Sequence, residues 1–144
     1  METPIRVLIA DDSPDITEML AFVIGIEPNM ECVGSLGSAN HLVEEIRSLR
    51  PDVVILDANM PGKDPLAVLV EIVAGFPGVK TILYSGYDDP DMIDRVIDAG
   101  AWGFVSKGRD PQAVIRAIRV VAAGSIAFPT RRSGSASTNL EPGA

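Results

Sequence analysis

Five polar side chains at the ends of strand-like apolar runs carry functional groups that can act together in one reaction. They are Asp11, Asp12, Asp57, Ser85 and Lys107. Each taken singly has an ordinary explanation, because Asp is common in turns and helix caps and a Ser or Lys after a strand is usually solvated. Chance is a poorer explanation for the whole set. Acids follow two of the apolar runs, a hydroxyl follows a third and a single ammonium follows a fourth. The set therefore indicates one site.

Three converging carboxylates need a cation. Asp11, Asp12 and Asp57 would repel one another and stay ionised only with a counter-charge, and hard oxygen ligands with room for water suit Mg²⁺. A carboxylate oxygen of Asp57 could also attack phosphorus and form an acyl phosphate, while an ammonium neutralises charge on the transferring group. Lys107 and Ser85 would contact the phosphoryl oxygens. The chemistry indicated is metal-assisted phosphoryl transfer to Asp57.

These residues need a scaffold that brings strand ends together. Short apolar runs alternate five times with segments of helical period. The predicted strands cover residues 5–10, 30–35, 52–57, 79–85 and 103–106. Three helices are predicted to begin at a Ser-Pro or Asp-Pro pair, in which the first residue is the N-cap and the proline is the first helical residue. These pairs are Ser13-Pro14, Asp64-Pro65 and Asp110-Pro111.

Strands that are apolar on both faces and joined by helices belong to a parallel sheet covered on both sides. Right-handed crossovers leave few topologies. We therefore predict an α/β fold with a flavodoxin-like (βα)₅ doubly wound five-stranded parallel sheet in the strand order 2-1-3-4-5. In such sheets function gathers at the carboxyl ends of the strands, near the point where strand order reverses. The five polar residues would all lie at that edge.

The segments IADDS, ILDANMPG, YSG and GFVSK together resemble the receiver domain of bacterial two-component response regulators, over about residues 4 to 124. The expected polar residues occur in the expected order at the strand ends, and a DxxMPG signature includes the central Asp. The resemblance implies a role for each residue. Asp57 would be the phosphoacceptor, and Lys107 would be the phosphate-binding lysine. Asp11 and Asp12 would hold Mg²⁺ together with Asp57 and the backbone carbonyl of Asn59. Ser85 would be the switch hydroxyl and Phe104 the switch aromatic.

The resemblance also implies partners. A sensor histidine kinase would present a phosphohistidine, Asp57 would take the phosphoryl group, and Ser85 and Lys107 would move toward it. Phe104 would then turn inward and change the surface formed by the fourth helix, fifth strand and fifth helix. The protein would be a cytoplasmic signalling phosphoacceptor and not an enzyme, with at most self-phosphorylation from phosphodonors and autodephosphorylation. A homodimer on phosphorylation is a further implied state.

Three positions depart from the common receiver pattern, and one of them is Phe104, which lacks the hydroxyl of the Tyr variant. Gly108 stands where many receivers have a Pro after the lysine, which leaves that loop more permissive. Pro65 stands where many have a Gly, and it is compatible with a helix start because proline suits the first helical position.

Composition limits the other possibilities. The chain has 144 residues, a hydrophobic fraction of 47% and a formal net charge of −8, which fit one domain with an ordinary core and disfavour direct binding to nucleic acid. Cys32 is the single cysteine, so an internal disulfide is excluded and a reducing compartment is expected. No apolar run is long enough to span a bilayer, so no membrane role is expected.

The receiver domain is expected to cover residues 1–124, followed by a linker or disordered tail over 125–144 that is rich in Ser, Gly, Pro and Ala. The segment VVAAGSIAFP resembles the end of receivers that precede a helix-turn-helix DNA-binding domain of the LuxR type. No such domain follows in this chain. Two interpretations stay open, a receiver fragment cut in its linker or a stand-alone receiver, and DNA would be reached only through an output domain that this chain does not contain.

Two other function classes compete with this interpretation. A haloacid-dehalogenase-like phosphatase also uses an Asp nucleophile, Mg²⁺, a Ser or Thr and a Lys, but it carries a second Asp two residues after the nucleophile, where this chain has Asn59. Its acidic pair also comes late in the chain, whereas Asp11 and Asp12 come first. A pseudo-receiver that no longer takes phosphate is the second alternative, and the intact residue set argues against it.

Overall fold

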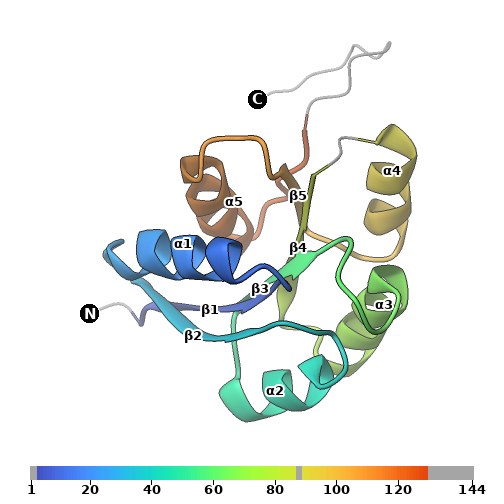
Figure 1. Ribbon diagram of the computed structural model, residues 1–144, viewed down its shortest axis with the longest axis horizontal. Coiled ribbons are helices and arrows are strands. Elements are labelled where there is room, and N and C mark those ends of the chain that lie inside the picture. Colours follow the sequence, from blue (N-terminus) through green and yellow to red (C-terminus); the bar gives the residue numbers. More distant parts are fainter. Residues whose placement is uncertain (1–2, 87–88, 130–144) are drawn as a thin grey trace.

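The computed structural model describes residues 3–86 and 89–129. In that part of the chain five strands alternate with five helices (Figure 1). The strands are β1 (Ile5–Ala10), β2 (Met30–Leu36), β3 (Val53–Asp57), β4 (Lys80–Ser85) and β5 (Gly103–Ser106). The helices are α1 (Pro14–Gly25), α2 (Leu42–Leu49), α3 (Pro65–Gly75), α4 (Pro90–Asp98) and α5 (Gln112–Ala122).

All strand pairs are parallel, and the sheet order is β2-β1-β3-β4-β5, which confirms the predicted topology. Figure 1 shows α1 and α5 on one face of the sheet and α2, α3 and α4 on the other. We call these the α1/α5 layer and the α2–α4 layer. Strand order reverses between β1 and β3, so the carboxyl ends of these two strands border the crevice where open α/β sheets bind ligands.

The core consists of two apolar clusters, one on each side of the sheet. In β3, Val53 and Ile55 point into the α1/α5 layer, whereas Val54 and Leu56 point into the α2–α4 layer. All four are at most 1% exposed. This is why the run contains no polar residue before its end: successive side chains of a strand alternate between faces, and both faces are covered. Burial of the strand holds its last residue, Asp57, in place.

The predicted helix starts are confirmed at two of the three pairs. Ser13 Oγ accepts a hydrogen bond from the backbone N–H of Ile16, and α1 begins at Pro14. Asp64 accepts one from Leu66 in the same way, and α3 begins at Pro65. At the third pair the α-helix begins one residue later than predicted, at Gln112.

The carboxylate of Asp110 accepts the backbone N–H of Gln112 at 2.9 Å. The same carboxylate therefore satisfies an otherwise unpaired donor at the start of α5, while Pro111 takes the capping position with no side-chain hydrogen bond. A one-residue difference of this kind is common at helix ends, where the hydrogen-bond pattern changes gradually.

Residues 125–129 follow β5 along the edge of the sheet. The backbone N–H of Ala127 donates to the carbonyl of Trp102 at 2.8 Å, and the carbonyl of Ala127 accepts from the N–H of Phe104 at 3.0 Å. The bridge is parallel to β5, and Phe128 packs against the α2–α4 layer. We call residues 125–129 the edge segment. It extends the sheet beyond the boundary at residue 124 that the sequence suggests, and the rest of the predicted tail, 130–144, lies outside the described residues.

Candidate functional site

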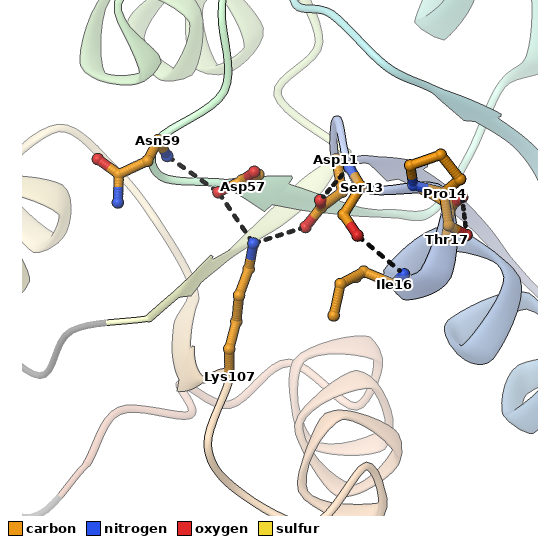
Figure 2. A network of polar contacts seen from close by, with 8 residues as sticks. All are labelled: Asp11, Ser13, Pro14, Ile16, Thr17, Asp57, Asn59 and Lys107. Carbon is orange, nitrogen blue, oxygen red and sulfur yellow. Dashed lines mark hydrogen bonds and ion pairs between the residues drawn. The ribbon is translucent and has the colours of Figure 1, made fainter.

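The polar residues predicted to act together lie at the carboxyl edge of the sheet. Asp11 follows β1, Asp57 ends β3, and Lys107 follows β5. Each lies two residues beyond a side chain of the α1/α5 layer, namely Ile9, Ile55 and Val105, so each continues onto that same face. Figure 2 shows Lys107 reaching between the two carboxylates.

One ammonium joins two buried carboxylates. Lys107 Nζ lies 2.9 Å from Asp11 Oδ2 and 3.3 Å from Asp57 Oδ1. Asp11 and Asp57 are only 2% and 3% exposed. Backbone donors complete the arrangement, because the N–H of Ser13 donates to Asp11 Oδ1 and the N–H of Asn59 donates to Asp57 Oδ1, both at 2.9 Å. The structure therefore brings together the central acid, one acid of the N-terminal pair and the lysine.

Burial dominates the titration of Asp57. Desolvation raises the pKa of this carboxyl above its ordinary value, the hydrogen bond from the N–H of Asn59 lowers it, the charge of Asp11 raises it, and the ammonium of Lys107 lowers it again. The net pKa is raised. The negative charge of Asp11 thus favours the protonated form of Asp57, and a bound cation relieves such repulsion between neighbouring carboxylates.

The neighbouring carboxylates decide the pKa of Lys107. Partial burial alone would lower the pKa of its ammonium, but the ion pair with Asp11 and the charge of Asp57 outweigh it, so the pKa is raised. The lysine is therefore a permanent cation at neutral pH.

The residues present fit a hard divalent cation. Asp11, Asp12 and Asp57 can each offer a carboxylate oxygen, and these oxygens lie within 4.8 Å of one another. Asp11 Oδ2 is buried, and its recorded partner is the Lys107 ammonium, whose geometry gives an ion pair without a well-directed hydrogen bond. Asp12 is exposed, so the cluster opens to solvent on one side. An all-oxygen set with access to water is the donor chemistry that Mg²⁺ prefers.

Ser85 lies on β4 and Phe104 on β5, the two strands that follow β3 in the order of the sheet. Ser85 ends β4 and is 2% exposed, and its carbonyl accepts the backbone N–H of Lys107 at 2.7 Å. Phe104 is 3% exposed and belongs to the cluster of the α2–α4 layer. Their predicted roles as switch hydroxyl and switch aromatic stay predictions, as does that of the Asn59 carbonyl.

The loop after β3 depends on a glycine. Gly62 has φ +103°, and a Cβ added there would lie 2.9 Å from Asn40 Oδ1 and 3.0 Å from Ser38 Oγ. A side chain at this position would be strained and would meet the loop before α2. Gly108, in contrast, is outside the left-handed region, and the described residues contain no cis peptide bond.

Sequence reasoning missed one residue at the site, Tyr84. It precedes Ser85 in β4, is 2% exposed and pairs in register with Asp57. Lys107 Nζ lies over its ring at 5.5 Å from the centroid. The period-two alternation of strands contained the signal, because the residue before Ser85 must face the same side as Asp57 if the two strands pair in register. Register itself could not be read from the sequence.

The comparisons with known proteins agree with this geometry. The family model for the response regulator receiver domain matches residues 7–119. Among curated proteins, the chain is 31% identical over 123 residues to the transcriptional regulatory protein DegU of Brevibacillus brevis, covering 85% of this chain and 52% of that protein. The chain thus spans about half the length of the curated relatives it matches.

Solved structures show the same architecture. The signal receiver domain of the putative response regulator NarL from Mycobacterium tuberculosis superposes with a TM-score of 0.81 at 26% identity, covering 85% of this chain and 99% of that one. A LuxR-family two-component response regulator from Aurantimonas sp. SI85-9A1 has the same fold, with a TM-score of 0.82 at 24% identity and coverage of 87% and 89%.

Within the described residues, the structure has no helix of the length and apolar character needed to cross a membrane.

Proposed function

The chain belongs to the response regulator receiver domain family, and from that premise we propose that Asp57 accepts a phosphoryl group from a sensor histidine kinase in a Mg²⁺-dependent reaction. Proteins of this family that regulate transcription are signalling proteins and not enzymes in the ordinary sense. Family membership favours this proposal over the phosphatase alternative that the sequence left open.

The observation that carries the proposal is the arrangement around Asp57. A buried carboxylate ends the central strand, with an ammonium 3.3 Å from Oδ1 and a second acid held by the same ammonium. Both recorded polar contacts of Asp57 fall on Oδ1. We therefore assign Oδ2 as the oxygen that attacks phosphorus.

In the proposed step, a new bond forms between Asp57 Oδ2 and phosphorus while the bond between phosphorus and the imidazole nitrogen of the kinase breaks. The electron pair of the broken bond stays on the imidazole. The Asn59 N–H and the Lys107 ammonium hold Oδ1 and so orient the carboxylate. Lys107 is also positioned to neutralise the charge of the arriving phosphoryl oxygens.

Asp11, Asp12 and Asp57 would hold Mg²⁺, with the backbone carbonyl of Asn59 as a further ligand. When bound, the ion would supply positive charge to the phosphoryl oxygens and relieve the repulsion among the three acids. Exposure of Asp12 leaves a route for the ion to enter from solvent.

The proposed output follows from the new charge. Phosphorylation adds nearly two negative charges at the sheet edge. Ser85 and Lys107 are proposed to move toward the phosphoryl group and Phe104 to turn inward, which would change the surface of α4, β5 and α5. The signal would then pass to an output domain, of the transcriptional kind that the description of DegU as a transcriptional regulatory protein indicates for that relative, or to a partner such as a second copy. The cytoplasm is the proposed place of the reaction.

The test is direct phosphorylation. The protein is incubated with Mg²⁺ and acetyl phosphate, and the intact mass is measured. We expect a gain of one phosphoryl group in the native protein, no gain for Asp57→Asn, and a normal gain for the control Asp98→Asn, which changes an exposed acid of α4. Labelling that persists in Asp57→Asn, or none in the native protein with Mg²⁺ present, would overturn the proposal.

A further inference from the structure

Tyr84 lies directly beside Asp57 in the sheet. The two residues pair in register between β3 and β4, and the backbone N–H of Ala58 donates to the carbonyl of Tyr84 at 3.0 Å. Side chains paired in register on neighbouring strands point to the same face. Tyr84 belongs to the cluster of the α1/α5 layer, the face onto which Asp57 continues. Its ring therefore lies on the same face of the sheet as the Asp57 carboxylate.

Lys107 approaches this ring from the neighbouring strand. Val105 pairs with Tyr84, and Lys107 comes two residues later on the same face. Its ammonium lies 5.5 Å from the ring centroid, 2.9 Å from Asp11 Oδ2 and 3.3 Å from Asp57 Oδ1. The cation thus has two carboxylates and the face of one aromatic ring as neighbours.

The third neighbour matters because the ammonium is largely withdrawn from water. The Lys107 side chain is 23% exposed. An aliphatic side chain in place of the ring would leave that side of the cation desolvated without compensation, whereas the negative face of an aromatic ring attracts the cation. A lysine has four flexible side-chain torsions, so a fixed ring also restricts where the ammonium can lie.

We propose that Tyr84 is a positioning residue for Lys107, whose aromatic face holds the ammonium in place between Asp11 and Asp57 before the phosphoryl group arrives. This inference rests on the proposed function and deepens it. Preorganised charge stabilises a transition state more than charge that must first be gathered. Replacing the ring should therefore slow phosphorylation without removing the nucleophile.

The ring face, and not the phenol hydroxyl, carries the proposed effect. Burial raises the pKa of the Tyr84 hydroxyl, so it is neutral at physiological pH. Phenylalanine keeps the ring and removes only the hydroxyl, whereas leucine removes the ring and keeps an apolar residue. The two variants Tyr84→Phe and Tyr84→Leu therefore separate the two groups.

The control variant is Ile82→Val. Ile82 lies two residues earlier in β4, is fully buried and belongs to the same cluster, so its truncation perturbs the same layer away from the lysine. Urea unfolding identifies conditions under which all variants are fully folded. A purely structural role of Tyr84 would predict that Ile82→Val and Tyr84→Leu act alike.

The first readout is the rate of Asp57 phosphorylation by acetyl phosphate at saturating Mg²⁺. We expect Tyr84→Leu to be slower by about five-fold to ten-fold, the size of a partly buried cation–π contact expressed as a rate. Tyr84→Phe should stay within about two-fold of the native rate by the same reasoning. An equal loss in both variants, or an unchanged rate in Tyr84→Leu, would overturn the proposal.

The second readout needs no phosphodonor. The chain has three lysines, Lys63, Lys80 and Lys107, so selective ¹³C labelling gives three resolvable methylene groups next to Nζ. Protons above an aromatic face shift upfield. Lys107 should show this shift in the native protein and in Tyr84→Phe and lose it in Tyr84→Leu.

The other two lysines are internal references. Lys80 lies over Trp102 at 5.0 Å from the ring centroid, so its shift should persist in every Tyr84 variant. Lys63 pairs with Glu71 on the surface and should show no ring shift. A Lys107 shift that is unchanged in Tyr84→Leu would overturn the contact. If the native protein took no phosphoryl group, the proposed function would fail while this readout still decided the contact.

Discussion

At the scale of single residues, Lys107 is the group on which the electrostatics of the site depends. It is the ion-pair partner recorded for both Asp11 and Asp57 among the described residues. A surface pair contributes little to stability, but a cation between two buried carboxylates compensates charges that cannot reach water. The same side chain would therefore stabilise the resting protein and prepare it for phosphoryl transfer.

Lys107→Met tests the stabilising part of this role. Removal of the ammonium leaves two buried carboxylates unpaired, and we expect a loss of about 1–3 kcal/mol in the free energy of unfolding in EDTA. Mg²⁺ should recover part of the loss, because the ion supplies the missing positive charge. Urea unfolding with and without Mg²⁺ measures both. The control is Lys63→Met, which breaks the exposed pair with Glu71 and should cost less than about 1 kcal/mol in either condition. Equal losses for Lys107→Met with and without Mg²⁺ would contradict this account.

Cys32 gives a pH prediction away from the site. Partial burial in β2 raises the pKa of its thiol. The folded protein therefore holds the thiol proton more tightly than the unfolded chain. This contribution to stability is complete below the unfolded thiol pKa of about 8.5 and is lost as pH rises from there through the folded value.

Two measurements check this prediction. Alkylation of native Cys32 should be slower at pH 8 than that of a free cysteine and should still be accelerating above pH 9, because the thiolate reacts. The free energy of unfolding should fall more steeply between pH 8 and 10 in the native protein than in Cys32→Ala. Identical slopes for the two proteins would show that the thiol pKa is not raised.

At the scale of elements, the edge segment is the least expected feature. Ala127 of this segment pairs with the backbone of Trp102 and Phe104, so the last strand of the sheet does not present a bare edge there. Unpaired strand edges invite association with other chains, and a paired segment protects them. Because Phe104 donates a hydrogen bond to Ala127, any movement of that part of β5 also reaches the edge segment.

Ala127→Pro tests whether the edge segment contributes to folding. Proline removes the N–H that donates to Trp102, and we expect the free energy of unfolding to fall by about 1–3 kcal/mol. Chemical denaturation measures the loss. Ile126→Ser is the matched control, because its side chain is 66% exposed and the ladder bonds of Ala127 remain. A variant as stable as the native protein would mean that the segment adds nothing to the domain.

At the scale of the whole molecule, a chain of net charge −8 gathers two of its acids in a nearly dry position with a third beside them. Repulsion among these carboxylates lowers the stability of the folded state. A bound cation would relieve this repulsion only in the folded state, where the three acids lie together. Metal binding and global stability should therefore be coupled.

Thermal and urea unfolding in the presence of Mg²⁺ test this coupling. At a free Mg²⁺ concentration 100 times the dissociation constant, the gain in stability should be about 2.7 kcal/mol. Asp12→Asn should reduce the gain, because it removes one ligand charge while changing only an exposed side chain. The exposed α1 residue Asp15 is the control, and Asp15→Asn should keep the full gain. A gain of the same size in Asp12→Asn would remove Asp12 from the metal site.

Most of the fold could be predicted from local pattern. The uninterrupted apolar run before Asp57 required a strand covered on both faces, and the Ser-Pro and Asp-Pro pairs marked the starts of α1 and α3. The predicted start of α5 lies one residue before the observed start, because either of two adjacent residues can serve as the cap of this helix. The sequence indicates a linker for the edge segment, because five residues without sustained period carry no strand signal of their own. Ala127 pairs only because the edge of β5 is available to it.

The chemical groups at the strand ends can be read from local pattern, because the alternation of apolar runs and helical segments places Asp11, Asp57, Ser85 and Lys107 at one edge of any parallel sheet of this topology. How these groups meet depends on the folded arrangement. Register set Tyr84 beside Asp57 and beneath Lys107, and packing left Asp12 open to solvent while Asp11 became buried. The physical reason is that residue type and period are local properties of the chain, whereas register, burial and the distance between charges arise only when distant strands pair.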